Sequence, residues 1–100
     1  ILLGEVRSKE IIPFVLAMNT GHRGILTTIH ADHAVSALKR LALLYNIHSP
    51  GNLSYSHSLD LICSNVDNVI FLKNKKIVEI IKVIGSGDNT PYYETLFEDL

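Results

Sequence analysis

Alternating apolar and polar stretches divide the first half of the chain into short strands and helices. The apolar run at 1–3 predicts a buried strand, and a run rich in threonine and isoleucine predicts a second strand at 25–29. Apolar residues go most of the way round a helix expected over 9–19, and helical spacing recurs over 34–45. This alternation of strands and helices is typical of a parallel, three-layer α/β fold.

Capping residues and breakers refine the two helices. Ser8 precedes the first helix and Asp32 precedes the second, and both residue types are favoured as N-caps. Gly21 is well suited to end the first helix in a left-handed conformation. Pro13 removes one backbone donor inside the first helix, so we expect that helix to start late or to bend.

The second half of the chain predicts one helix followed by antiparallel strands. A short helix is expected over 56–63. Apolar runs at 69–72 and 77–84 flank a polar turn, which predicts a β-hairpin. The glycine-rich stretch at 85–91 is expected to be a flexible link, and 92–97 to add an edge strand. The expected fold is therefore a parallel α/β sheet extended by a C-terminal hairpin.

Composition limits the class of protein. The 100 residues are 47% hydrophobic, which is enough for one small core and too apolar for disorder. Nine basic and ten acidic residues give a formal net charge of −1, so no basic surplus indicates a nucleic-acid partner. The single Cys63 excludes an internal disulfide, fits a reducing compartment and is expected to be a small buried hydrophobic residue.

Two further features concern the chain as a whole. No apolar run reaches the roughly 18 residues of a transmembrane helix. The chain opens on an apolar strand rather than on methionine, so we expect it to be a fragment of a longer protein.

Polar side chains follow both of the strands expected to be parallel. Glu5 and Arg7 come after the first strand, and His30 comes after the second. Ligands of open parallel sheets bind outside the carboxyl ends of the strands, so neighbouring strands would bring these side chains into one crevice. A carboxylate there can hold a magnesium-bound water, an imidazole can hydrogen-bond a phosphate oxygen, and an arginine can neutralise its charge. The same residues also fit a solvated loop and a packed or exposed histidine.

The order of three segments resembles the type II/IV secretion ATPase family. The segment ILLGEVRSKE is similar to the Walker B segment of that family, here residues 1–7. The segment AMNTGHRGILTTIHA contains a sequence like its histidine box, here residues 20–31, and ALKRLALL supplies the arginine of the next helix as Arg40. The box continues as TTIHAD, which looks more like the type IV secretion and conjugation branch than the pilus-retraction branch.

This resemblance implies a role for each matching residue. Glu5 would be the Walker B glutamate, acting on the attacking water and, through a bound water, on Mg²⁺. His30 would be the second catalytic residue, facing the phosphates of ATP. Thr20 would assist by hydrogen bonding, while Gly21 and Gly24 would let the backbone turn tightly in the box. The other residues implied in binding ATP or its phosphates are Arg7, His22, Thr28 and Arg40. Two alternatives stay open for Arg40: it reaches a partner subunit, or it pairs with a side chain on its own helix.

The resemblance also implies the setting. The family is one of RecA-like P-loop ATPases that use ATP and Mg²⁺, form homo-hexamers and work in the cytoplasm, peripheral to the inner membrane, with components of a secretion machine. The phosphate-cradling motif Gly-x-x-x-x-Gly-Lys-Ser/Thr is absent from these 100 residues. We therefore expect residues 1–100 to be the C-terminal part of an ATPase domain that powers type IV secretion or conjugation, inactive on its own.

Several other interpretations stay open. A pilus or type II secretion motor belongs to the same family, and a non-catalytic interaction module of such a machine is the strongest alternative outside enzymes. Among five histidines, His30 and His33 are three apart and could share a metal ion, but no cysteine pair or acidic cluster completes a site. A basic turn is expected to be solvated rather than to bind lipid or nucleic acid; it holds Lys73, Lys75 and Lys76.

Overall fold

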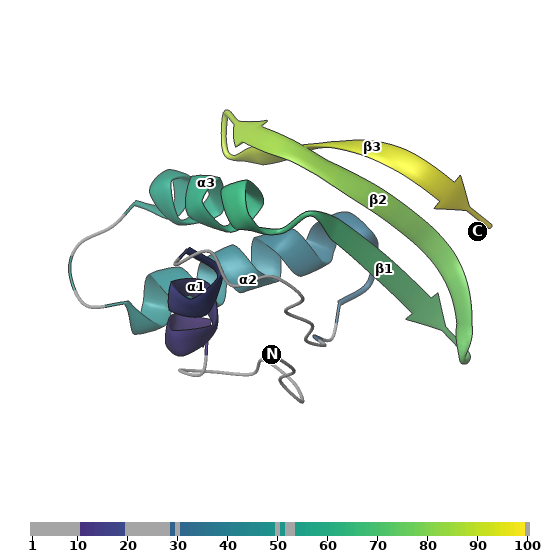
Figure 1. The fold of residues 1–100 in the computed structure, drawn as a ribbon, viewed down its shortest axis with the longest axis horizontal. Coiled ribbons are helices and arrows are strands. Elements are labelled where there is room, and N and C mark those ends of the chain that lie inside the picture. Colours follow the sequence, from purple (N-terminus) through teal and green to yellow (C-terminus); the bar gives the residue numbers. More distant parts are fainter. Residues whose placement is uncertain (1–10, 20–28, 30, 50, 52–53, 100) are drawn as a thin grey trace.

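Three helices precede a three-stranded sheet in the computed structural model, which describes residues 11–19, 29, 31–49, 51 and 54–99 (Figure 1). The helices are α1 (Ile11–Asn19), α2 (Ala34–His48) and α3 (Tyr55–Asn65). The strands are β1 (Asn68–Lys73), β2 (Lys76–Gly87) and β3 (Thr90–Glu98), arranged in the order β1-β2-β3. Figure 1 shows the helices gathered on one side of a long, curved sheet.

The described sheet is antiparallel throughout, which corrects part of the expected fold. Each strand is joined to the next by a two-residue turn, and such short connections can join only antiparallel neighbours. The expected C-terminal hairpin is confirmed. The strands expected to be parallel, at 1–3 and 25–29, lie outside the described residues except Ile29, which is not in a strand. The RecA-like, three-layer arrangement therefore stays a prediction.

Both hairpin turns are formed by consecutive residues with positive φ. The first turn has Asn74 at 54° and Lys75 at 66°, and the second has Asp88 at 52° and Asn89 at 60°. Two successive left-handed residues are the mark of a type I′ turn, whose twist matches that of the flanking strands. The stretch expected to be a flexible link is therefore the end of β2, a tight turn and the start of β3. Asn and Asp adopt the left-handed conformation more readily than most residues, which explains the correction.

The helix boundaries differ slightly from those expected. α2 continues to His48, about one turn beyond the predicted end. α3 starts at Tyr55 because Ser54 is its N-cap and accepts a hydrogen bond from the His57 backbone N–H at 3.1 Å. Pro13 lies within the described part of α1, and the expectation that it delays or bends this helix stays a prediction. No described helix has both the length and the apolar character needed to cross a membrane.

The hydrophobic core lies between the three helices and the inner face of β2. Its most deeply buried side chains come from every helix and from the sheet, and include Ile11, Val15, Leu38, Leu59, Ile62 and Ile81. Cys63 joins this cluster with 4% of its surface exposed, so the expected burial of the thiol is confirmed.

The outer face of the sheet is apolar as well. The register places Ile70 opposite Ile80 and Ile80 opposite Phe97, and Leu72 opposite Ile77. We call these five residues the outer apolar face. Four of them are exposed, since only Ile80 is half-buried. The sheet thus presents hydrophobic side chains on both faces, of which the helices cover one.

Candidate functional site

The first turn of α2 follows the predicted histidine box directly, and its N-terminus has no local cap. His33 is the N-cap residue, with extended backbone (φ −151°, ψ 165°) and no capping hydrogen bond from its side chain. The expectation that Asp32 caps this helix is wrong, because Asp32 lies one residue too early and is exposed. The leading N–H groups of a helix need acceptors from elsewhere in such a case.

Glu79 on β2 supplies one of these acceptors. The backbone N–H of Ala34, the first residue of α2, donates to Oε1 of Glu79 at 2.9 Å. Both residues are buried, with exposed fractions of 0% for Ala34 and 8% for Glu79. A carboxylate is favoured at a helix N-terminus by the helix dipole. Loss of this acceptor would leave a buried N–H unsatisfied, at a cost of about 1–3 kcal/mol.

Phe71 on β1 contacts the neighbouring residue of the same turn. The rings of Phe71 and His33 lie with their centroids 6.2 Å apart and their planes tilted by 45°. In the sheet register Phe71 is directly opposite Glu79, so the two side chains lie on the same face. One cross-strand pair therefore contacts both His33 and Ala34.

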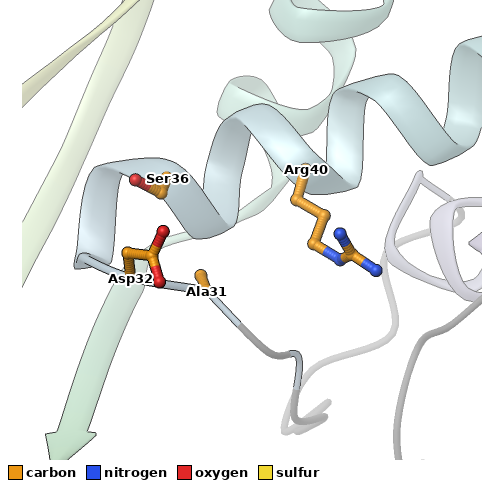
Figure 2. Close-up of a pocket in the computed structure, with 4 residues that line it drawn as sticks. All are labelled: Ala31, Asp32, Ser36 and Arg40. Atoms are coloured by element: carbon orange, nitrogen blue, oxygen red, sulfur yellow. The ribbon is translucent and has the colours of Figure 1, made fainter.

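An open hollow lies beside this turn, on the side that leads to Arg40. It has a volume of about 440 Å³ and is lined by Ala31, Asp32, Ser36 and Arg40. Figure 2 shows the Arg40 side chain leaving α2 on the side where Ala31 and Asp32 enter the helix. A second hollow, of about 460 Å³, lies between the same turn and the sheet; it is lined by Ala31, Asp32, His33, Phe71, Leu72 and Lys73.

The chemistry of the first hollow is dominated by Arg40. The residue is exposed, and within the described part of the chain no ion pair involves it. A guanidinium keeps its charge at all ordinary pH values and offers a planar fork of donors, which matches carboxylate and phosphate oxygens. The hollow thus combines the carboxylate of Asp32 with the guanidinium of Arg40, and the guanidinium is the group that could bind an anion at the start of α2.

Arg40 is the one predicted site residue that the structure describes. The other predicted site residues lie outside the described residues: Glu5, Arg7, His22, Thr28 and His30. Their meeting in one crevice stays a prediction, as do the roles of Thr20, Gly21 and Gly24. Of the two histidines considered as metal ligands, only His33 is described, and it contacts Phe71. The described residues contain no group of three or more His, Cys, Asp or Glu side chains that could hold a metal ion.

Sequence reasoning missed Glu79. A signal for its burial is present in β2, where every second residue faces the same side of the sheet. Glu79 shares that side with Ile81 and Val83, which are core residues. An acidic residue at an inward position of such a strand needs a buried partner, since burying an unpaired charge is costly. The partner, the N-terminus of a helix 45 residues earlier, is invisible to any local pattern.

Comparison with known proteins decides the family. A family model described as "Type II/IV secretion system protein" matches residues 1–80. The chain belongs to this family. The expected membership is therefore confirmed. The matched residues of this chain include the predicted Walker B segment, the predicted histidine box, Arg40 and Glu79.

Curated relatives of the chain include conjugation and secretion proteins. It is 33% identical over 106 residues to the conjugal transfer protein TrbB of Rhizobium radiobacter, covering 99% of this chain and 31% of that protein. It is 37% identical over 76 residues to the type IV secretion system protein PtlH of Bordetella pertussis, covering 75% of this chain and 22% of that protein. It is 32% identical over 74 residues to the type IV secretion system protein VirB11 of Bartonella henselae, covering 73% and 21%. The chain thus spans a third or less of the length of these relatives.

Proposed function

We propose that this chain is part of an ATPase that powers type IV secretion or conjugative transfer by hydrolysing ATP. The family match over residues 1–80 carries the proposal, because it includes both predicted motifs and Arg40. The names of the relatives support the process, since they are conjugal transfer and type IV secretion proteins. The chain covers 31% of the relative TrbB, so the phosphate-cradling loop belongs, in this proposal, to another part of a longer protein.

Among the described residues, Arg40 supports the binding of an anionic nucleotide. Arg40 lies exposed in the open hollow beside Ala31 and Asp32, which follow His30 in the sequence. Its guanidinium can donate two parallel hydrogen bonds to phosphate oxygens, and no described carboxylate pairs with it. When bound, ATP with Mg²⁺ supplies the phosphoryl group that passes to water. Arg40 would contact the phosphates of its own site or of a site shared with the neighbouring subunit.

The proposed roles of the remaining residues follow from the motif order. Glu5 would orient the attacking water and accept its proton, and it would help to hold Mg²⁺ through a water when the ion is bound. His30 donates a hydrogen bond to a phosphate oxygen. Phosphate contacts are assigned to Arg7, His22 and Thr28.

The proposed setting is a homo-hexamer on the cytoplasmic side of the inner membrane. Nucleotides would bind near subunit boundaries, and hydrolysis would move domains against each other to drive export or transfer. The partners would be inner-membrane components of the secretion machine.

The test is steady-state ATP turnover by the full-length protein, with and without Mg²⁺, beside its Glu5→Gln variant. We expect turnover to require Mg²⁺ and to fall by about a hundredfold or more in the variant, because the amide cannot accept the proton of water. Glu94→Gln is the matched control, since Glu94 is an exposed residue of β3. The control should keep the turnover of the unaltered protein.

A full-length protein without ATP turnover would overturn the proposal, and a Glu5→Gln variant as active as the original would overturn the catalytic role of Glu5. The first result would favour a non-catalytic interaction module. The outer apolar face supports that second candidate function, because exposed hydrophobic side chains gathered on one face mark many protein–protein contacts. A pilus or type II secretion motor would pass the turnover test and differ in the process that it drives.

A further inference from the structure

The start of α2 is held by the sheet rather than by its own sequence. The cap of a helix normally comes from the residue just before it. Here His33 occupies that position without a side-chain cap bond, and Glu79 accepts from Ala34 N–H instead. The helix that carries Arg40 therefore depends on β2, which supplies the hydrogen-bond acceptor for the backbone N–H of its first residue.

Two side chains of the sheet act at consecutive residues of this turn. Phe71 and Glu79 are directly opposite each other on β1 and β2. Phe71 contacts the ring of His33, and Glu79 binds the backbone of Ala34. We call Phe71 and Glu79 the strand clamp. The sheet thus makes a ring contact and a buried hydrogen bond with two consecutive residues of this turn.

The clamped turn lies between two residues of the proposed nucleotide site. His30 precedes His33 by three positions, and Arg40 lies about two helical turns after Ala34 on the same helix. The hollow lined by Ala31, Asp32, Ser36 and Arg40 is bounded by the same turn. A displacement of the first turn of α2 would therefore change the position of Arg40 relative to a bound phosphate.

We propose that Glu79, with Phe71, is a positioning residue that fixes the first turn of α2 and thereby sets the position of Arg40 on the same helix. The inference rests on the proposed ATPase function. Glu79 touches no reacting atom, and it acts through the backbone of Ala34. Catalysis is sensitive to such placement, because a misplacement of about 1 Å can cost two orders of magnitude in rate.

The experiment compares three variants of the full-length protein. Glu79→Leu removes the acceptor at similar side-chain size, and Glu79→Gln keeps an oxygen acceptor without the charge. Glu98→Leu is the matched control, because Glu98 is the cross-strand neighbour of Glu79 on β3 and is exposed. The two readouts are amide hydrogen exchange at residues 33–36, and the kcat and KM for ATP.

In Glu79→Leu we expect exchange at residues 33–36 to accelerate by about tenfold or more while exchange in α3 is unchanged. We expect kcat to fall by about tenfold or more with KM within about twofold, since a transition-state geometry is lost rather than ground-state binding. Glu79→Gln should stay within about threefold of the unaltered protein in both readouts. Glu98→Leu should match it.

Each contrary result has a distinct meaning. Unchanged exchange in Glu79→Leu would overturn the clamp, and accelerated exchange with unchanged kcat would overturn its catalytic consequence. An unaltered protein without ATP turnover would overturn the proposed function, while the exchange comparison would still decide whether Glu79 holds the turn. If Glu79→Leu does not fold, Phe71→Leu removes the ring contact with His33 and is expected to give the same pattern in both readouts.

Discussion

Cys63 shows how burial changes the chemistry of a single side chain. It lies on α3 with 4% of its surface exposed, among the apolar residues of the core. Burial raises the pKa of the Cys63 thiol from 9.0 to about 11, and the nearby negative charge of Asp60 adds to the shift. Both effects disfavour the thiolate, which is the reactive form of cysteine. The residue is therefore part of the packing.

We expect the native chain to react with a thiol reagent such as DTNB at least about tenfold more slowly at pH 8 than the urea-unfolded chain. At this pH a pKa near 11 leaves about a hundredfold less thiolate than a pKa of 9.0, although each thiolate is then somewhat more nucleophilic. The native rate should continue to rise toward pH 11, while the unfolded rate levels off above pH 9. Equal rates at pH 8 would show that the thiol is accessible and ionised in the folded state.

The raised pKa of Cys63 also makes the free energy of unfolding depend on pH. The folded state keeps the thiol proton to a higher pH than the unfolded state, so both states are protonated below about pH 9. Between about pH 9 and 11 the unfolded chain loses its proton first, and the free energy of unfolding decreases as the pH rises.

At the scale of the element, the two hairpin turns differ in backbone strain, because their residues tolerate positive φ to different degrees. The turn of the second hairpin consists of Asp88 and Asn89, both of which tolerate positive φ. The first turn has Asn74 followed by Lys75, whose φ is 66°. For a residue with a Cβ the left-handed conformation costs about 1–2 kcal/mol, and lysine gains no local hydrogen bond to offset it.

We therefore expect Lys75→Gly to raise the free energy of unfolding by about 0.5–1 kcal/mol, since glycine relieves the strain but gains entropy in the unfolded chain. Urea unfolding followed by circular dichroism measures the change. Lys76→Gly is the control: Lys76 is the first residue of β2, where glycine should lower stability by about 0.5–1 kcal/mol. A loss of stability in Lys75→Gly would contradict the account of this turn.

The elements that could be predicted from the sequence are those set by local signals. The helical spacing over 34–45 and the apolar runs on either side of the first turn located α2, β1 and β2 to within a few residues, because neighbouring side chains fix them. Glycine and serine at 85–91 predict a flexible link, whereas the structure has a tight turn there that depends on Asp88 and Asn89. The sequence predicts Asp32 as the cap of α2, whereas the acceptor for the first backbone N–H of this helix is Glu79 on β2.

The residues of the candidate site also divide into those that local sequence signals predict and those that depend on long-range contacts. Arg40 was predicted from the motif order, and the structure places it in an open hollow at the start of α2. Glu79 could not be assigned a role from the sequence, because its partner is Ala34, and the pair is joined only when α2 packs on the sheet. Local patterns identify residue types, while long-range contacts need the fold.

At the scale of the whole molecule, the two faces of the sheet have different energetic roles. Ile81 points into the core with 0% exposure, while Ile84, three residues along the same strand, is 65% exposed. The stability of the chain depends mainly on the first kind of residue, because the fully buried apolar side chains of the sheet lie on its inner face.

We expect Ile81→Ala to cost about 2–5 kcal/mol, because it removes buried methyl groups and leaves a cavity among α2, α3 and β2. Ile84→Ala should change stability by no more than about 0.5 kcal/mol. Both values come from urea unfolding of the same chain. Similar losses in the two variants would mean that the outer side of β2 is covered by packing that the isolated sheet does not show.

The Ala34–Glu79 hydrogen bond also bears on the order in which the chain folds. The strand pairs join residues that are close in sequence, through two-residue turns that close at small entropic cost. The bond between α2 and β2 spans 45 residues and closes a far longer loop. Because contacts of short sequence separation close the smaller loops, we expect the hairpins to form before α2 packs on the sheet. The C-terminal third would then be the surface on which the half of the chain with the proposed nucleotide site assembles.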